Sequence, residues 1–141
     1  MSYLLDTNVV SEWTKPRPHP AVVAFLASTD EDLLFLSVVT LAELRRGVDR
    51  LALGRRRAAL SDWLEHDLIQ RFDLRILGID RAVASAWGRI MSRAERHGTT
   101  PGVMDVWIAA VAEVHGLMVV TRDTADFAPL LDNVFNPWRG G

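Results

Sequence analysis

Four acidic residues lie far apart in the sequence, yet each stands at or near the end of a short apolar segment or the start of a helical one. Asp6 follows the apolar run at 3–5, and Asp123 lies two residues after the run at 117–121. Glu43 comes six residues after the apolar run at 32–37, and Asp105 begins a helical pattern. Apolar runs of this length predict buried strands, and the carboxyl ends of parallel strands share one edge of a sheet. We therefore expect these acids to meet.

Gathered carboxylates repel one another, and two charges about 4 Å apart cost roughly 4 kcal/mol at an effective dielectric constant of 20. Such a group must bind protons, spread apart or hold a cation. An all-oxygen ligand set without His or Cys suits Mg²⁺, with Mn²⁺ as a possibility. An ion of this kind can activate water for attack on a phosphodiester. The pattern therefore indicates a hydrolytic metal site, with Asp126 as a possible fifth acid.

Each acid also has an explanation that involves no site. Asp6 could be a turn residue or a helix cap. Glu43 fits a capping box with Thr40, since Thr-Leu-Ala-Glu matches the S/T-x-x-E pattern. Asp105 near a helix start is favoured by the macrodipole, and Asp123 is typical of an N-cap. Their common placement at strand ends is the reason to prefer the site.

Strands and helices are predicted to alternate along the chain. Strands are expected at 2–5, 32–37, 74–79 and 117–121, with a marginal fifth at 134–135. Helices are expected at 8–13, 20–28, 40–53, 55–72, 80–98 and 103–116, with a short helical turn from Asp123. This pattern predicts an α/β fold with three layers, in which helices cover both faces of a short parallel sheet of four to five strands. We expect one domain over 1–141.

The composition limits the classes of protein to consider. The chain has no cysteine, so thiolate metal sites and cysteine nucleophiles are excluded. No apolar run reaches the roughly 18 to 20 residues of a membrane helix, and the N-terminus lacks the pattern of a signal peptide. We expect a cytoplasmic protein that contacts no membrane. The net charge of −2 means that any nucleic-acid binding depends on a local basic patch.

Four motifs in order carry a resemblance to a known family. They are LLDTNVVSE at 4–12, LSVVTLAELRRG at 36–47, VMDVWIAAVAEVHG at 103–116 and TRDTADF at 121–127. Together they resemble the PIN-domain nucleases, and more narrowly the VapC-type toxins of toxin–antitoxin pairs. The closing VFNPW is similar to a subgroup associated with fast intracellular trafficking. The resemblance implies a metal-dependent endoribonuclease, a homodimer and a small antitoxin whose C-terminal segment blocks the active site.

The resemblance also implies roles for individual residues. Catalytic metal ligands would be the four acids, Asp6, Glu43, Asp105 and Asp123. Supporting positions would be Thr7, Asn8 and Thr121, with Asp126 secondary because family members vary there. One departure from the family pattern is Pro101-Gly102 just before the third motif, which predicts a locally different loop.

Arginines crowd the stretch from 45 to 57, whereas Lys15 is the only lysine in the chain. The candidates for contacts with RNA phosphates are Arg45, Arg46, Arg55 and Arg56. The alternative for this stretch is a solvated helix face that also contacts the antitoxin.

Two other functions would also gather acids around Mg²⁺ at strand ends. A phosphatase with Asp6 as nucleophile usually has a second acid two residues on, where this chain has Asn8, and a lysine to hold the phosphate. A receiver-like signalling domain would normally have a lysine after the last strand, and none is present there. The sequence therefore favours the nuclease over both.

Overall fold

Five parallel strands form one sheet at the centre of the protein. The computed structural model describes residues 1–139. The strand order is β3-β2-β1-β4-β5. The strands are β1 (Tyr3–Leu5), β2 (Leu34–Ser37), β3 (Ile76–Leu77), β4 (Met118–Val120) and β5 (Val134–Phe135). The first strand is central, since Leu4 pairs with Phe35 of β2 on one side and with Val119 of β4 on the other.

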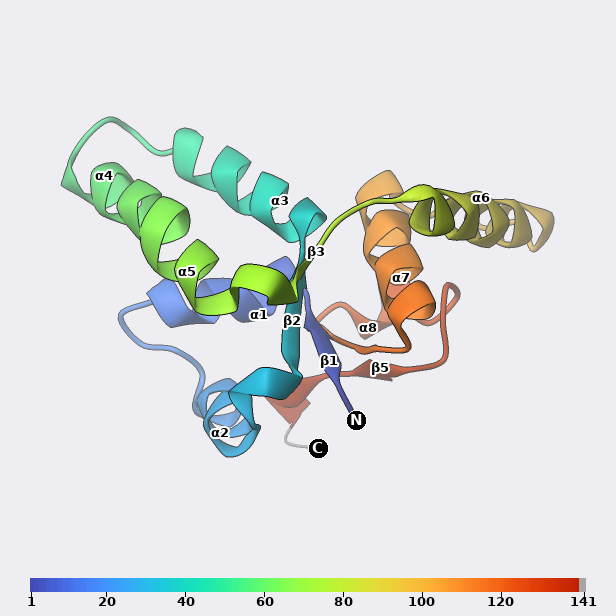
Figure 1. Cartoon of the computed structure of the whole chain (residues 1–141), viewed down its shortest axis with the longest axis horizontal. Coiled ribbons are helices and arrows are strands. Elements are labelled where there is room, and N and C mark those ends of the chain that lie inside the picture. The colour runs from blue at the N-terminus through green and yellow to red at the C-terminus, as the bar shows by residue number, and fades with distance from the viewer. Residues whose placement is uncertain (140–141) are drawn as a thin grey trace.

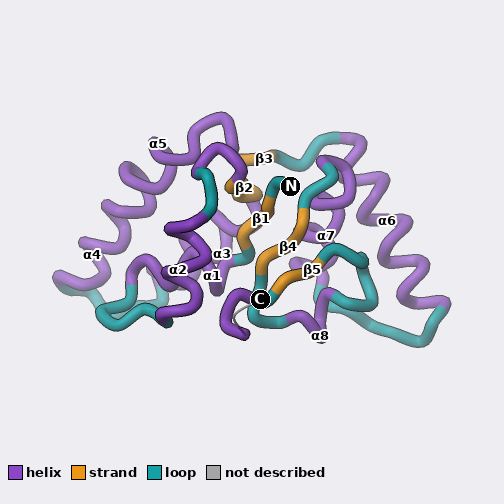
Figure 2. Tube along the Cα trace, turned by 90° about the horizontal axis from the view of Figure 1, so that it is seen from below, coloured by secondary structure: helices purple, strands orange, loops and turns teal. Residues whose placement is uncertain are grey.

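Helices cover both faces of this sheet (Figures 1 and 2). One side carries α1 (Thr7–Ser11), α2 (Pro20–Ser28), α3 (Val38–Asp49), α4 (Arg55–Asp62) and α5 (Ile69–Phe72). The other side carries α6 (Arg81–Arg96), α7 (Val103–His115) and α8 (Thr124–Phe127). Within residues 1–139, no helix is long and apolar enough to cross a membrane. The predicted three-layer α/β fold with a parallel sheet is confirmed.

The strands divide the core into two apolar clusters, because successive side chains of a strand point to opposite faces. Leu4 and Val119 belong to the cluster under α6 and α7. Leu5 and Val120 belong to the cluster under α1 to α5. All four side chains are fully buried, as expected of strands covered on both faces. The two clusters hold β1 and β4 rigidly at the middle of the molecule.

Three predicted elements have different boundaries in the structure. The helix predicted over 55–72 is α4, a π-helical stretch at Trp63–Leu68 and α5 in succession. The helix predicted over 40–53 is α3, which begins at Val38 and ends at Asp49. The strand predicted over 74–79 is only Ile76–Leu77. Before that strand, Asp73 has a positive φ of 45° and residues 73–75 form a 3₁₀ turn, so the extended conformation begins late.

The start of α3 also corrects the predicted capping box of Thr40 and Glu43. The N-cap is Ser37, whose buried Oγ accepts a hydrogen bond of 3.2 Å from the backbone N–H of Thr40. Thr40 lies inside the helix, and its buried Oγ1 has no hydrogen-bond partner in the described part of the chain. Glu43 is therefore not needed to cap the helix, and its side chain is available elsewhere.

We expect Ser37→Ala to lower the free energy of unfolding by about 1 kcal/mol, because it removes the N-cap of α3. Thr40→Val keeps the shape of the side chain and removes an unpaired hydroxyl, so it should be neutral or slightly stabilising. Urea unfolding of both variants measures the difference. A larger loss for Thr40→Val than for Ser37→Ala would restore Thr40 as the cap.

Candidate metal-dependent nuclease site

The order of the strands creates a crevice at one edge of the sheet. The chain moves from β1 to β2 on one side of β1, and β4 then returns to its other side. In such sheets a ligand site lies beyond the carboxyl ends of the strands at this switch point. Asp6 follows β1 at this point, and its backbone N–H donates to the Val120 carbonyl of β4 at 2.9 Å. The side chain of Asp6 is only 6% exposed.

Three groups surround the carboxylate of Asp6. Thr121 Oγ1 donates to Asp6 Oδ2 at 2.8 Å, and the backbone N–H of Thr7 donates to Oδ1 at 2.8 Å. Asn8 Nδ2 makes a long contact of 3.5 Å with Oδ2. Asp6 is thus the N-cap of α1, as its alternative explanation proposed, and is at the same time bonded across the switch point to β4. One oxygen serves the helix, and the other faces the strand end.

Asn8 links Asp6 to the fourth acid. Its Nδ2 donates to Asp123 Oδ2 at 3.1 Å and lies 3.4 Å from Thr121 Oγ1, while its Oδ1 accepts from the backbone N–H of Arg122 at 3.3 Å. The backbone N–H of Asp123 donates to Thr121 Oγ1 at 3.0 Å. Asp123 stands at the N-cap position of α8, but its side chain makes no capping bond. The carboxylate of Asp123 is therefore oriented toward Asn8.

Thr7 links α1 to the second acid. Its Oγ1 donates to Glu43 Oε1 at 2.6 Å across 36 residues of sequence. Glu43 lies in the second turn of α3, six residues after the Ser37 cap. This bond holds Glu43 toward the strand end, where the sequence pattern predicted it.

Asp105 reaches the site from the first turn of α7. The loop with Pro101 and Gly102 does not displace it, because α7 begins at Val103 as predicted. Gly102 leaves space beside Asp105: a Cβ there would lie 3.4 Å from Asp105 Oδ2. Among the neighbouring acids, Asp126 on α8 raises the pKa of Asp105 most, ahead of Glu43 and Asp123. The structure thus brings the secondary acid to Asp105 as well.

The environment of Asp6 favours its protonated form when no cation is present. Burial raises the pKa of the Asp6 carboxyl, and the charges of Glu43 and Asp105 raise it further. Hydrogen bonds from Thr121 and Thr7 lower it, and the balance places the pKa at about 6. Burial followed by the charges of Asp126, Glu43 and Asp123 also raises the pKa of Asp105. Raised pKa values with specific charge partners in a crevice are typical of functional sites.

The donor set fits a hard divalent cation. Every polar atom around Asp6 is an oxygen or an amide, and a cation would remove the repulsion that raises the two pKa values. Within residues 1–139, no three His, Asp or Glu side chains converge into a ready-made metal cage. Mg²⁺ is usually bound through one or two protein carboxylates and keeps several of its waters.

The arginines predicted to bind RNA are not equivalent in the structure. Arg45 donates to Asp49 at 2.7 Å and to Glu65 at 2.9 Å, so it serves to hold α3 against the π-helical stretch. The other three, Arg46, Arg55 and Arg56, are exposed and make no ion pair within residues 1–139. Arg45 is thus already paired with acids of this chain, whereas the other three are not, and all four stay predictions as phosphate contacts.

Glu12 is a buried acid that nothing in the sequence pattern distinguishes from an exposed helical one. It follows α1 and is 2% exposed. It forms an ion pair with Lys15, three residues on. The only sign of this ion pair in the sequence is the three-residue spacing between Glu12 and the single lysine.

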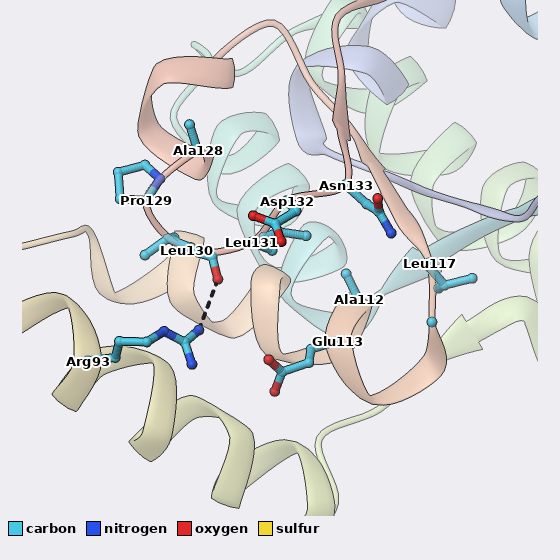
Figure 3. Close-up of a pocket in the computed structure, with 11 residues that line it drawn as sticks. Arg93, Ala112, Glu113, Leu117, Ala128, Pro129, Leu130, Leu131, Asp132 and Asn133 are labelled. Atoms are coloured by element: carbon cyan, nitrogen blue, oxygen red, sulfur yellow. Dashed lines mark hydrogen bonds between the residues drawn. The ribbon is translucent and has the colours of Figure 1, made fainter.

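A hollow on the side of the sheet that carries α6 and α7 does not contain the acids. It has a volume of about 490 Å³ and lies at the opposite ends of β4 and β5, between α6, α7 and the loop after α8 (Figure 3). Arg93, Glu113 and Asp132 point into it, and Arg93 donates to the Leu130 carbonyl at 3.4 Å. None of the predicted site residues lines this hollow.

Comparisons with known proteins agree with this geometry. The chain is 44% identical to toxin FitB of Neisseria gonorrhoeae over 136 residues, which are 96% of this chain and 98% of the relative. It is 37% identical to the VapC ribonuclease Y4jK of Sinorhizobium fredii, over 96% of this chain and 97% of the relative. The crystal structure of FitAcB from Neisseria gonorrhoeae superposes with a TM-score of 0.91 at 43% identity, covering 96% of this chain and 98% of that one.

The fold and the acidic strand edge together define a metal-dependent nuclease fold. The family model of the PIN domain matches residues 3–129, and the chain belongs to the PIN-domain family. The resemblance inferred from the four motifs is confirmed.

The raised pKa of Asp6 predicts how stability changes with pH. The folded protein binds this proton more tightly than the unfolded chain, so the contribution of Asp6 to stability is greatest below pH 4 and falls as the pH rises to about 6. The folded and unfolded pKa values of Asp6 differ by about two pH units, which corresponds to roughly 3 kcal/mol of unfolding free energy. In metal-free buffer, the unfolding free energy of Asp6→Asn relative to the parent should therefore rise between pH 4 and pH 7. Urea unfolding across this range measures it, and a constant difference would show that the pKa is not raised.

Proposed function

We propose that this protein is the toxin of a type II toxin–antitoxin pair and a metal-dependent endoribonuclease. Membership of the PIN-domain family and the similarity to FitB and VapC ribonucleases support this proposal. The observation that carries it is the buried carboxylate of Asp6, bonded to Thr121 and Thr7 and close enough to Glu43 and Asp105 to feel their charge. An RNA substrate places the activity in the cytoplasm.

The residues proposed to hold the cation are Asp6 and Asp105, with Glu43 and Asp123 beside them. Mg²⁺ is the proposed ion, and Mn²⁺ has the same preference for oxygen ligands. When bound, the cation polarises a phosphate oxygen and makes water a stronger nucleophile at neutral pH.

The chain itself supplies positioning and charge. Thr121 and the Thr7 N–H hold the Asp6 carboxylate in one orientation and oppose its protonation. Asn8 and Thr7 hold Asp123 and Glu43 at the same edge. The side-chain bonds of Thr121, Asn8 and Thr7 join segments that are far apart in the sequence, so Asp6, Asp123 and Glu43 keep fixed positions before any substrate arrives. A pre-organised acidic edge of this kind costs little reorganisation during the reaction.

The proposed partner is a small antitoxin. The related solved structures are complexes of this type, including FitAB bound to a DNA fragment, with a TM-score of 0.90 and 41% identity. We also propose a homodimer. Trp87 and Trp107 stack at 5.2 Å between ring centroids, and the exposed side chains of Val103 and Met104 lie on the same turn of α7. Aromatic and Met side chains of this kind are enriched in interfaces.

The proposed reaction predicts that cleavage needs both Asp6 and a divalent ion. Asp6→Asn should reduce cleavage of single-stranded RNA by more than about a hundredfold, since even the loss of outer ligand contacts costs 10–100-fold. EDTA should stop cleavage by the parent, and added Mg²⁺ or Mn²⁺ should restore it.

The matched control is Asp132→Asn, an exposed acid at the opposite end of the sheet, which should cut RNA at the parent rate. The measurement is the cleavage rate of a labelled RNA under single-turnover conditions. Cleavage that persists in excess EDTA, or an Asp6→Asn variant as fast as the parent, would refute the proposed site.

The toxin role makes a separate prediction in cells. Expression of the parent should arrest bacterial growth, and co-expression of the antitoxin encoded beside it should relieve the arrest. Expression of Asp6→Asn should be tolerated at the same protein level, because the arrest requires cleavage. Growth rate and immunoblotting provide the measurement. Normal growth with high levels of an active parent enzyme would indicate an ordinary nuclease instead.

A further inference from the structure

Glu12 is an acid that the metal site does not use. Its side chain is buried, and its Oε1 accepts from the backbone N–H of His19 at 2.8 Å. Its Oε2 forms an ion pair with the Lys15 ammonium. Burial of a lone carboxylate costs several kcal/mol unless opposite charge compensates it. The neighbours of Glu12 therefore define its role.

Glu12 pairs with one cation, Lys15, and the charge of a second, Arg122, also acts on it. Burial alone would raise the pKa of Glu12, but the Lys15 ammonium, the His19 N–H and the nearby guanidinium of Arg122 together lower it below its ordinary value. Glu12 is thus ionised at neutral pH, and its buried negative charge attracts both cations. Breaking a pair with a buried carboxylate is costly, so Lys15 is held in place more firmly than an ordinary surface cation.

Arg122 is fixed at both its ends. Its backbone N–H donates to Asn8 Oδ1 at 3.3 Å, and Asn8 in turn donates to Asp123. Its guanidinium lies 5.2 Å from the ring centroid of Trp138, a distance at which cation–π attraction operates. Arg122 therefore lies immediately beside the acidic edge, separated from it only by Asn8.

Both cations remain accessible to a ligand. The Lys15 side chain is 48% exposed, and Arg122 is exposed. Within residues 1–139, Glu12 is the only carboxylate that pairs with Lys15, and Arg122 makes no ion pair within 4 Å. The loop after Lys15 adds Arg17 and His19 to the same exposed segment. This surface carries positive charge next to a site that is strongly negative.

We propose that Lys15 and Arg122 form a subsite for a backbone phosphate of the RNA, next to the one being cleaved, in which the buried Glu12 holds Lys15 and the contacts with Asn8 and Trp138 hold Arg122. This inference rests on the proposed ribonuclease function. An RNA strand whose reacting phosphate lies at the acids must place its next phosphates beyond the edge of the acidic cluster. Guanidinium and ammonium groups are the usual partners of phosphate oxygens. The link through Asn8 to Asp123 favours RNA as the ligand over an acidic protein segment.

Arg122→Gln and Lys15→Gln test the subsite with a single-stranded RNA that the parent cleaves. Each should raise KM about three- to tenfold and leave kcat within twofold, since a contact to a neighbouring phosphate contributes to binding. Each should also reduce the slope of log(kcat/KM) against log salt by about 0.7, the value for one phosphate contact on a single strand. Arg96→Gln, an exposed arginine at the end of α6, is the control with the same change in net charge and should leave both parameters unchanged.

Glu12→Gln tests the anchoring role. It keeps the shape of the side chain and removes its charge, so it should raise KM by a similar factor while the dependence of cleavage on metal concentration stays that of the parent. If this variant fails to fold, the two cation variants alone decide the proposal.

The outcomes separate the two proposals. A parent protein that cuts no RNA with Mg²⁺ or Mn²⁺ refutes the proposed function. A parent that cuts, with cation variants that keep its KM and salt slope, refutes the subsite alone. A fall in kcat at constant KM places Arg122 at the reacting phosphate and also refutes the subsite. Unchanged RNA kinetics with weaker inhibition by the antitoxin assign the surface to the protein partner and overturn the proposal.

Discussion

The site depends on the burial of the Asp6 carboxylate beyond the end of β1, at the point where the strand order of the sheet reverses. Asp6 is enclosed because β1 is central, with β2 on one side and β4 on the other. Burial and the neighbouring acids both favour its neutral form, and the bonds from Thr121 and Thr7 only partly oppose them. The folded protein therefore holds an unfavourable charge arrangement, which a divalent cation relieves. The packing of two apolar clusters on both faces of β1 stabilises the fold against this cost.

Polar links across distant segments make the arrangement specific. Glu43 is held by Thr7, and Asp123 is held by Asn8, so the short segment after β1 orients acids from α3 and from the end of β4. Thr121 joins the same network from β4. A small hydroxyl or amide suits these positions, because it bonds to a carboxylate oxygen and leaves other lone pairs of that oxygen free for a ligand.

Much of this site was predictable from the sequence, because strand ends and helix starts have strong local signals. Apolar runs located β1, β2 and β4, and parallel strands place their carboxyl ends together whatever the details of the loops. The capping box of Thr40 and Glu43 was wrong, since Ser37 three residues earlier offers the helix an equally good cap. The sequence offers two local caps for this helix. The choice between them depends on whether Glu43 bonds to the helix start or to Thr7, which lies 36 positions away. The π-helical stretch at Trp63–Leu68 likewise has no local signal that separates it from an α-helix.

The sequence did not indicate which charged side chains are buried or paired in the folded protein. Composition alone made the arginines from 45 to 57 the natural phosphate contacts, yet Arg45 is neutralised by Asp49 and Glu65. Lys15 and Arg122 are isolated in the sequence, but in the structure Lys15 pairs with the buried Glu12, and the charge of Arg122 also acts on that carboxylate. An acidic site that binds an anionic polymer needs cationic side chains that do not pair with the acids of the site. A cationic side chain inside the acidic cluster would compete with the metal ion. Glu12 meets this requirement because its buried charge pairs with Lys15 and attracts Arg122, and Glu12 is not among the acids bonded to Thr7, Asn8 or Thr121.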